Sequence, residues 1–290
     1  MKRLVMAGVY GLFTLGLAAG ASAAEVTWKG CGITKLAFMA EISKAYEAKT
    51  GIPVKLSGGG ATQGIRAASA GTSDIGGTCR QVLKEGGAVH PEESNAVLTQ
   101  VAWDAMVVIV HPSNPVENIS VEQLKAIYDG TITNWNELGG PDKRIVLVTR
   151  DGKYSGVGHM FRMEVFGDKE YEFKARSLKV KSTGPLEAKV EKAEASLGID
   201  GISSAKKREV KFLNLNGVAP SKDNIASGNY PLIRPLYLAL NKSPSNPEAQ
   251  KVLDFVLSDE GQAIISAQGT VNLAEGAALN EKWQAIKAKF

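Results

Sequence analysis

Three glycine-rich turns, each between a predicted strand and a predicted helix, carry the residue types that could hold a small anion. They are Gly30-Cys31-Gly32-Ile33-Thr34, Gly58-Gly59-Gly60-Ala61-Thr62-Gln63-Gly64 and Ser155-Gly156-Val157-Gly158. A helix N-terminus presents unpaired N–H groups and a partial positive charge, and glycine lets the backbone come close to a bound group. Three such turns with hydroxyl side chains among them indicate a receptor for a small oxyanion.

The elements that must position these turns follow from the pattern of apolar residues. Strands predicted over Val26–Lys29 and Ile52–Leu56 lead into the first two turns, and helices are predicted over Leu36–Lys49 and Gly64–Ala70. This alternation of short strands and helices is typical of an α/β fold with mainly parallel sheets. Such sheets bind ligands beyond the C-terminal ends of their strands, which is where the three turns lie.

Two long apolar runs indicate buried strands farther along the chain. Val101–Val110 and Pro235–Asn241 stand about 130 residues apart, which suits a pair of connections between two lobes. A helix is predicted to begin after Ser120, because Gln123 occupies the capping-box position, and another is predicted over Glu248–Leu257.

The N-terminus and the composition restrict the location and the partners. Residues 1–24 have the pattern of a secretory signal peptide, with Lys2 and Arg3 before an apolar stretch and small residues at its end. Its removal would leave about 266 of the 290 residues and take the formal net charge from +4 to +2. We therefore expect an exported, periplasmic protein, and the near balance of charge argues against nucleic acid as a partner.

The chain resembles the phosphate-type substrate-binding proteins of bacterial ABC importers, within the type II periplasmic binding protein superfamily. The resemblance covers almost the whole mature sequence. It is carried by Gly58-Gly59-Gly60 with Gly71-Thr72-Ser73-Asp74-Ile75, by Asp129-Gly130-Thr131-Ile132-Thr133-Asn134-Trp135, by Tyr230-Pro231-Leu232-Ile233-Arg234-Pro235-Leu236-Tyr237 and by Phe255-Val256-Leu257-Ser258-Asp259-Glu260-Gly261-Gln262.

The resemblance implies a two-lobed α/β fold with a hinged cleft that closes on a tetrahedral oxyanion. Lobe 1 is expected to comprise residues 25–105 and 236–290, and lobe 2 residues 106–235. The ligand is expected to be phosphate, delivered by a monomeric protein to an ABC permease, with no cofactor and no metal. The ligand-binding residues implied by the resemblance are Gly32, Thr34, Gly60, Thr62, Cys79, Arg80, Arg150, Ser155 and Gly156.

The residue types of this set suit the task. A guanidinium group such as that of Arg150 can make two charge-assisted hydrogen bonds to one oxyanion, each contributing on the order of 1.5–3 kcal/mol. Taken singly, Thr34 and Ser155 could equally be ordinary helix N-caps, and Arg150 could form a surface ion pair. Val157 stands where the family has a hydroxyl, and no Asp stands at position 79 to accept a proton from a protonated oxyanion.

The two cysteines, Cys31 and Cys79, leave the identity of the ligand open. In an oxidising compartment they could form a disulfide, which would stabilise the fold by roughly 4 kcal/mol for a loop of this length. As free thiols beside helix N-termini they would be reactive and would have affinity for soft metal ions or trivalent arsenic, with His159 as a further candidate ligand. The alternatives to phosphate are therefore an arsenate- or arsenite-binding protein that signals to a sensor kinase, and a soft-metal-binding protein.

The sequence does not support an enzyme. Asp151, Ser155 and His159 are neighbours in the chain, but a nucleophile needs a base and an orienting group that converge in space. The sequence contains no metalloprotease or nucleotide-binding motif. We therefore expect binding without turnover.

Overall fold

A single sheet of nine strands runs through both lobes of the computed structural model, which describes residues 25–288. The predicted signal peptide, residues 1–24, lies outside the described residues. In order across the sheet, the strands are β2 (Val54–Gly58), β1 (Val26–Gly30), β3 (Ile75–Thr78), β13 (Ile233–Asn241), β6 (Ala96–Val110), β10 (Ser196–Gly201), β8 (Val146–Arg150) and β9 (Leu178–Val180), while β11 (Lys211–Phe212) also pairs with β6.

The outer strands of each lobe are parallel, whereas the strands that cross between the lobes are antiparallel to their neighbours. β1 runs parallel to β2 and β3 in lobe 1, and β8 runs parallel to β10 and β9 in lobe 2. β13 is antiparallel to β3 and β6, and β6 is antiparallel to β10. The sheet is therefore mixed: β13 runs against the outer strands of lobe 1, and β6 runs against those of lobe 2.

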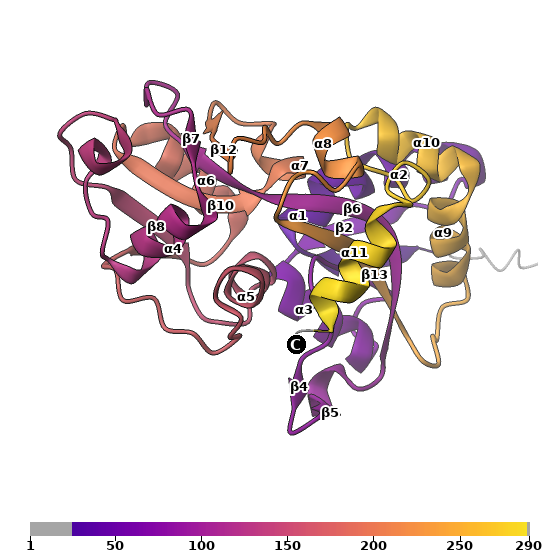
Figure 1. The fold of residues 1–290 in the computed structure, drawn as a ribbon. Helices are drawn as coiled ribbons and strands as arrows, with labels where there is room; N and C mark the ends of the chain where they lie inside the picture. The colour runs from indigo at the N-terminus through magenta and orange to yellow at the C-terminus, as the bar shows by residue number, and fades with distance from the viewer. Residues whose placement is uncertain (1–24, 289–290) are drawn as a thin grey trace, which may run out of the picture.

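β6 is the strand that joins the lobes. It pairs with β13 as far as Ala105 and with β10 from Met106 onward, so one continuous strand belongs to both halves of the sheet. Figure 1 shows it crossing the whole molecule. Its residues from Val101 to Val110 are buried, as the apolar run predicted, but it begins five residues earlier, at Ala96.

Helices cover both lobes. Those of lobe 1 are α1 (Gly32–Thr34), the π-helix η1 (Lys35–Met39), α2 (Ala40–Thr50), α3 (Gly60–Ala70), α9 (Glu248–Leu257), α10 (Asp259–Ala267) and α11 (Leu279–Lys287). Those of lobe 2 are α4 (Val121–Asp129), η3 (Trp135–Leu138), α5 (Gly156–Phe161), the π-helix η4 (Arg162–Phe166) and α6 (Thr183–Lys192). α7 (Ile202–Ala205) and α8 (Lys222–Ala226) lie over the junction of the lobes in Figure 1.

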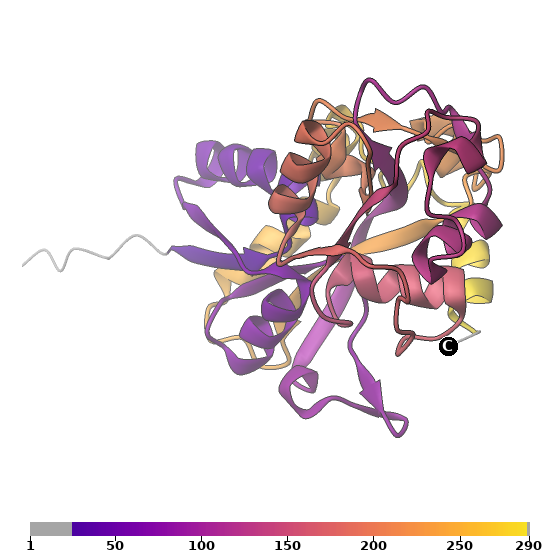
Figure 2. The ribbon, with the colours of Figure 1, turned by 90° about the vertical axis from the view of Figure 1, so that its left-hand side faces the viewer.

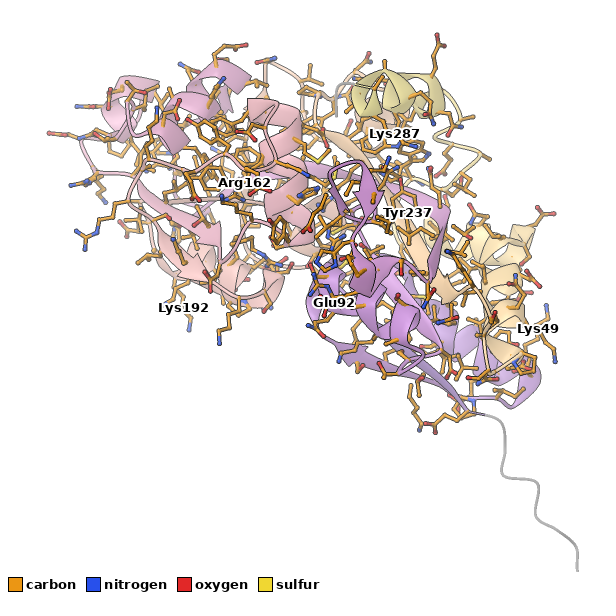
Figure 3. All side chains as sticks on the ribbon, turned by 90° about the horizontal axis from the view of Figure 1, so that it is seen from below. Lys49, Glu92, Arg162, Lys192, Tyr237 and Lys287 are labelled. Atoms are coloured by element: carbon orange, nitrogen blue, oxygen red, sulfur yellow. The ribbon has the colours of Figure 1, made fainter. Side chains whose placement is uncertain are left out.

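Several short elements complete the described chain. They are β4 (Lys84–Glu85), β5 (Ala88–Val89), η2 (Pro91–Glu93), β7 (Asn118–Ile119) and β12 (Asn214–Leu215). The β4–β5 hairpin projects from lobe 1, as Figures 1 and 2 both show. Figure 3 places Arg162 and Lys192 in lobe 2 and Lys49 at the far end of lobe 1. In the described part of the chain, no helix combines the length and the apolar character that crossing a membrane requires.

The helix ends show where local sequence rules hold and where packing overrides them. The capping box at Ser120 and Gln123 is present, so this prediction is confirmed. α3 begins at Gly60, four residues before the predicted start at Gly64. A Cβ atom at Gly64 would lie 2.7 Å from the Gly77 carbonyl oxygen and 2.9 Å from that of Lys29. Gly64 therefore lies within the helix, where the absence of a side chain lets α3 pack directly on the strand backbones.

Candidate functional site

The turns after β1 and β3 meet at one edge of lobe 1. Gly30 and Gly77 are register partners in the parallel pair, and the Cys31 amide donates to the Gly77 carbonyl at 3.1 Å. Cys31 and Cys79 follow these partners, and both are free and buried. Their thiol groups lie close enough to shift each other's pKa. The structure thus brings the two cysteines together as a dithiol, not as a disulfide.

The two thiols differ in acidity. Burial by itself would raise the pKa of Cys31, but hydrogen bonds from Cys79 and Thr34 lower it to about 7. The Thr34 amide donates to the Cys31 sulfur at 3.4 Å, which makes Cys31 the N-cap of α1. The hydrogen bond to Cys31, together with burial, raises the pKa of Cys79 well above its usual range. Cys31 is therefore the more acidic of the two thiols and ionises first.

Two glycines mark the place where the lobes touch. A Cβ atom at Gly156, the first residue of α5, would overlap the Cys79 sulfur and come within 3.0 Å of the Ala61 Cβ. A Cβ atom at Gly32 would lie 3.6 Å from the Thr183 Cβ, at the start of α6. The third turn therefore packs against Cys79 and the second turn, whereas the first turn packs against the start of α6.

Arg150 lies at the end of β8 with only 8% of its surface exposed. Its Nη1 donates to the Thr183 hydroxyl at 3.3 Å, and its Nε atom is buried without a partner. Thr183 in turn donates to the Asp200 Oδ1 atom at 3.4 Å, which links the guanidinium and the carboxylate through one hydroxyl. Arg150 is thus a buried cation with a free donor, not part of a surface ion pair.

Asp200 supplies an acidic group that the sequence analysis did not single out. It is fully buried near the end of β10, and its Oδ1 accepts a 2.8 Å hydrogen bond from the Gly201 amide. Its Oδ2 is buried and has no partner. Burial raises the pKa of Asp200 to about 7, although the charge of Arg150 opposes the shift. The group can therefore accept or hold a proton near neutral pH.

Arg234 is the second functional residue that the sequence analysis missed. It lies on β13, fully buried, and its Nη2 and Nε donate to the Asp104 Oδ2 atom at 2.8 and 3.2 Å. Its Nη1 atom is buried without a partner, and its charge lowers the pKa of both Cys31 and Cys79. A Cβ atom at Gly201 would lie 2.5 Å from Nη2, which places Arg234 beside Asp200. The sequence did contain a signal for Arg234, which is a charged residue next to an apolar run. A charge buried in such a strand needs a specific partner, so it marks a candidate functional residue.

The structure gives Arg80 a different role from the ligand-binding role predicted for it. Its guanidinium forms a fully buried bidentate pair with Glu93, at 2.7 and 3.0 Å. The remaining donors bond to the Gln81 carbonyl, the Tyr154 carbonyl and the Thr62 hydroxyl. All five N–H donors of Arg80 therefore have protein acceptors, and none is left for an anion. The sequence could not show this, because Glu93 lies 13 residues away.

Thr62 and Ser155 also use their hydroxyl groups within the protein. The Thr62 hydroxyl donates across the cleft to the Tyr154 carbonyl at 2.8 Å, so with Arg80 it fastens the second turn to lobe 2. Ser155 caps α5 by accepting from the Gly158 amide at 3.0 Å, which leaves its O–H donor available. Gly60 adopts a φ of +82° at the start of α3, a conformation that favours glycine.

His159 is not a third ligand beside the thiols. Among residues 25–288, no group of three or more His, Cys, Asp or Glu side chains is placed to hold a metal ion. Burial, together with the charge of Arg80, lowers the pKa of His159 to about 3. Its imidazole is therefore neutral at physiological pH and lines a cavity described below.

Comparison with known proteins identifies the family. The model of the PBP superfamily domain matches residues 33–260. The chain belongs to the periplasmic binding protein superfamily. It is 32% identical over 188 residues to the phosphate-binding protein PstS of Borreliella burgdorferi, covering 62% of this chain and 67% of that protein. It is 26% identical to PstS of Bacillus subtilis over 252 residues, covering 87% and 81% of the two chains.

Solved structures of this superfamily share the fold. A substrate-binding protein attributed to a phosphate ABC transporter of Clostridium perfringens, with bound phosphate, superposes with a TM-score of 0.76 at 28% identity, covering 86% of this chain and 99% of that one. An ABC-type phosphate transport receptor from Vibrio cholerae gives a TM-score of 0.64 at 28% identity, covering 85% and 99%. The predicted two-lobed α/β fold of the type II periplasmic binding proteins is confirmed.

Proposed function

We propose that this chain captures phosphate between its lobes and delivers it to an ABC permease. The observation that carries the proposal is the convergence of three buried, unpartnered polar atoms: Arg150 Nε, Arg234 Nη1 and Asp200 Oδ2. Buried polar atoms normally have hydrogen-bond partners, so such a group calls for an explanation. Two cationic donors and one acceptor complement an oxyanion that carries negative charge and one proton.

The arrangement favours a protonated oxyanion over a fully ionised one. Monobasic and dibasic phosphate both carry a P–O–H group that can donate to Asp200, whereas sulfate at neutral pH has no proton to give. Above about pH 7, where Asp200 is ionised, its carboxylate would face sulfate without a hydrogen bond between them. Leaving a buried acceptor unpaired costs about 1–3 kcal/mol, and repulsion between like charges adds to that.

The backbone and the thiols would complete the binding shell. The turns at Gly32 and Gly156 carry N–H groups at the starts of α1 and α5. Thr34 lies fully buried in the first turn beside Cys31. We place Gly32, Thr34, Cys79, Arg150, Ser155 and Gly156 around the ligand, add Arg234 and Asp200, and assign Arg80 and Thr62 to the contact between the lobes.

Export to the periplasm and delivery to a permease belong to the same proposal. They are supported by the signal-like pattern of residues 1–24 and by relatives that are named phosphate-binding proteins. The test is calorimetric titration of the mature chain with phosphate and sulfate. Saturable phosphate binding at a 1:1 ratio, with sulfate at least about 100-fold weaker, would support the proposal. Equal affinity for both anions would contradict the role of Asp200.

The dithiol favours one alternative ligand. Cys31 and Cys79 are adjacent, free and buried at the cleft, and thiolates bind trivalent arsenic. If the chain binds arsenite through these thiols, arsenite should compete with phosphate. The double variant Cys31→Ser, Cys79→Ser should then no longer bind arsenite. Phosphate binding that survives this change, without any arsenite binding by the parent chain, would eliminate the arsenite-sensor alternative. A soft-metal role gains no support, because the described residues place no third His or acidic ligand near the thiols.

A further inference from the structure

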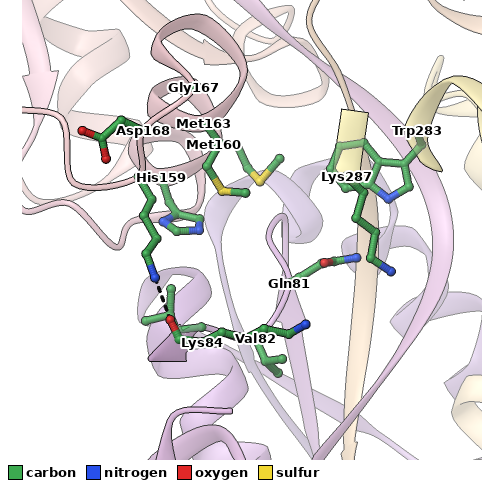
Figure 4. Close-up of a pocket in the computed structure, with 12 residues that line it drawn as sticks. Gln81, Val82, Lys84, His159, Met160, Met163, Gly167, Asp168, Trp283 and Lys287 are labelled. Atoms are coloured by element: carbon green, nitrogen blue, oxygen red, sulfur yellow. Dashed lines mark hydrogen bonds between the residues drawn. The ribbon is translucent and has the colours of Figure 1, made fainter. Parts of the chain in front are cut away.

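A cavity lies between the lobes, apart from the residues assigned to phosphate. It has a volume of about 300 Å³ and is lined by both lobes. His159, Met160 and Met163 come from α5 and η4 of lobe 2, whereas Trp283 and Lys287 come from α11 of lobe 1. Figure 4 shows these two groups on opposite sides, with the segment from Gln81 to Lys84 below them. The volume is at the lower end of the range for small-molecule sites.

His159 gives the cavity a buried polar group without a protein partner. Its side chain lines the cavity, the residue is 6% exposed, and its Nδ1 atom has no hydrogen-bond partner. Because burial and nearby cations keep the imidazole neutral, one ring nitrogen is a donor and the other an acceptor. A ligand with a polar group could satisfy this imidazole, which the protein alone leaves unpaired.

The rim of the cavity is positively charged. Lys84, Lys169 and Lys287 line it together with a single acidic residue, Asp168. The Lys169 ammonium donates to the Lys84 carbonyl at 2.6 Å, a contact between the lobes that is drawn as the dashed line in Figure 4. This excess of cations attracts an anion and repels a metal ion. The thioethers of Met160 and Met163 are therefore not proposed as metal ligands.

The interior is apolar and adaptable. Trp283 is buried and offers an indole ring on one side, and the flexible thioethers of Met160 and Met163 face it from the other. Methionine side chains adjust to irregular shapes and make favourable contacts with aromatic rings. The combination of apolar walls and a cationic rim is complementary to a small organic anion that has an apolar or aromatic body.

We propose that this cavity is a second binding site, for a small organic anion with an apolar body, and that its occupation favours the closed arrangement of the lobes. A molecule held between α5 and α11 contacts both lobes at once, so it binds the closed form better than an open one. A ligand shifts a conformational equilibrium by its difference in affinity for the two states. The coupling to phosphate rests on the function proposed above, whereas the site itself does not.

The test uses 8-anilinonaphthalene-1-sulfonate, an aromatic sulfonate that fluoresces when it enters an apolar site. Titration of the full mature chain should give saturable binding of one molecule per chain. Lys287→Glu should weaken this binding about fivefold, because it reverses a charge at the rim. Lys192→Glu is the matched control, because Lys192 is also exposed but lies at the end of α6 and does not line the cavity.

The outcomes separate the site from the phosphate proposal. Equal weakening by Lys287→Glu and Lys192→Glu, or fluorescence that never saturates, would overturn the site. Phosphate at saturation should tighten dye binding by the same factor by which the dye tightens phosphate binding, since coupling is reciprocal. Phosphate that binds without changing dye affinity would overturn the coupling. Saturable dye binding by a chain that does not bind phosphate would support the site and contradict the phosphate function.

Discussion

Asp104 and Arg234 are register partners on the crossing strands β6 and β13, and they form an ion pair in which neither side chain is exposed. The Asp104 Oδ1 atom also accepts from the amide and the hydroxyl of Ser203, at 3.1 and 2.8 Å. The pair therefore ties both crossing strands to α7 at the junction of the lobes. It also holds the Arg234 guanidinium in place beside the dithiol and Asp200.

Breaking this pair should destabilise the whole chain. Arg234→Met leaves the Asp104 charge buried without compensation, and we expect the free energy of unfolding to fall by about 3–5 kcal/mol. The double change Asp104→Leu, Arg234→Met should recover much of this loss, because no buried charge remains. Lys143→Met is the control: it breaks the exposed pair with Glu194 and should cost less than about 1 kcal/mol. Urea unfolding measures all three, and a cost for Arg234→Met no larger than the control would contradict the interpretation.

Arg150 should dominate the affinity of the cleft for phosphate. Arg150→Ala removes a buried cation with a free donor, and we expect binding to weaken by about 2–5 kcal/mol. Arg150→Lys should restore only part of the affinity, because an ammonium lacks the planar fork. Arg144→Ala provides a control on an exposed residue close by in the chain. Calorimetry with phosphate checks the series, and an Arg150→Ala affinity equal to that of the parent chain would remove Arg150 from the site.

Asp200 should make stability depend on pH in a defined window. Its pKa rises from 3.8 to about 7 on folding, so the folded chain binds the proton more tightly than the unfolded chain. The resulting stabilisation is fully present below about pH 4 and is lost as the pH rises through about 7, by an amount on the order of 4 kcal/mol.

Asp200→Asn tests this window directly. The variant keeps a neutral side chain of similar shape at every pH, so its stability relative to the parent chain should increase between pH 4 and 8. His159 makes an opposite contribution to the pH dependence, because folding lowers its pKa. Contributions of this kind are the same in both chains and cancel in the difference. Unfolding midpoints measured across the range give the result, and a difference that does not vary with pH would show that Asp200 keeps an ordinary pKa.

The thiols should be protected when the cleft is closed. Gly156 packs against Cys79, so an alkylating reagent can reach the pair only when the lobes separate. Without ligand we expect alkylation by iodoacetamide to rise with an apparent pKa of about 7, set by Cys31, and to slow at least about tenfold with saturating phosphate. Mass spectrometry with time gives both rates. Equal rates with and without phosphate would mean that the ligand does not close the lobes over the dithiol.

Closure itself should be visible in solution. Hinge closure around a ligand is common among two-lobed binding proteins, so small-angle scattering should show a smaller radius of gyration with phosphate than without it. Arg80→Ala removes the bonds from the second turn to the Tyr154 carbonyl and should shift the ligand-free chain toward a more open particle. Identical profiles for all samples would count against lobes that move.

Local features of the sequence determined much of the architecture. The glycine-rich turns, the capping box at Ser120 and the two long apolar strands were predicted correctly, because each depends on residues that are close together in the chain. The family resemblance supplied the two-lobed α/β fold. The adjacency of Cys31 and Cys79 followed from two parallel strands that end at one edge.

Only the tertiary structure decided which side chains remain available to a ligand. Arg80 was a sound candidate by sequence, but Glu93 and the Tyr154 carbonyl occupy its donors. Arg234 and Asp200 were not predicted to bind the ligand, yet each keeps a buried atom without a partner. The physical reason is that a donor or acceptor remains free for a ligand only if no other protein group satisfies it. The groups that could satisfy it come from distant parts of the chain. A sequence pattern fixes the type and spacing of such groups, whereas folding decides which of them are already satisfied.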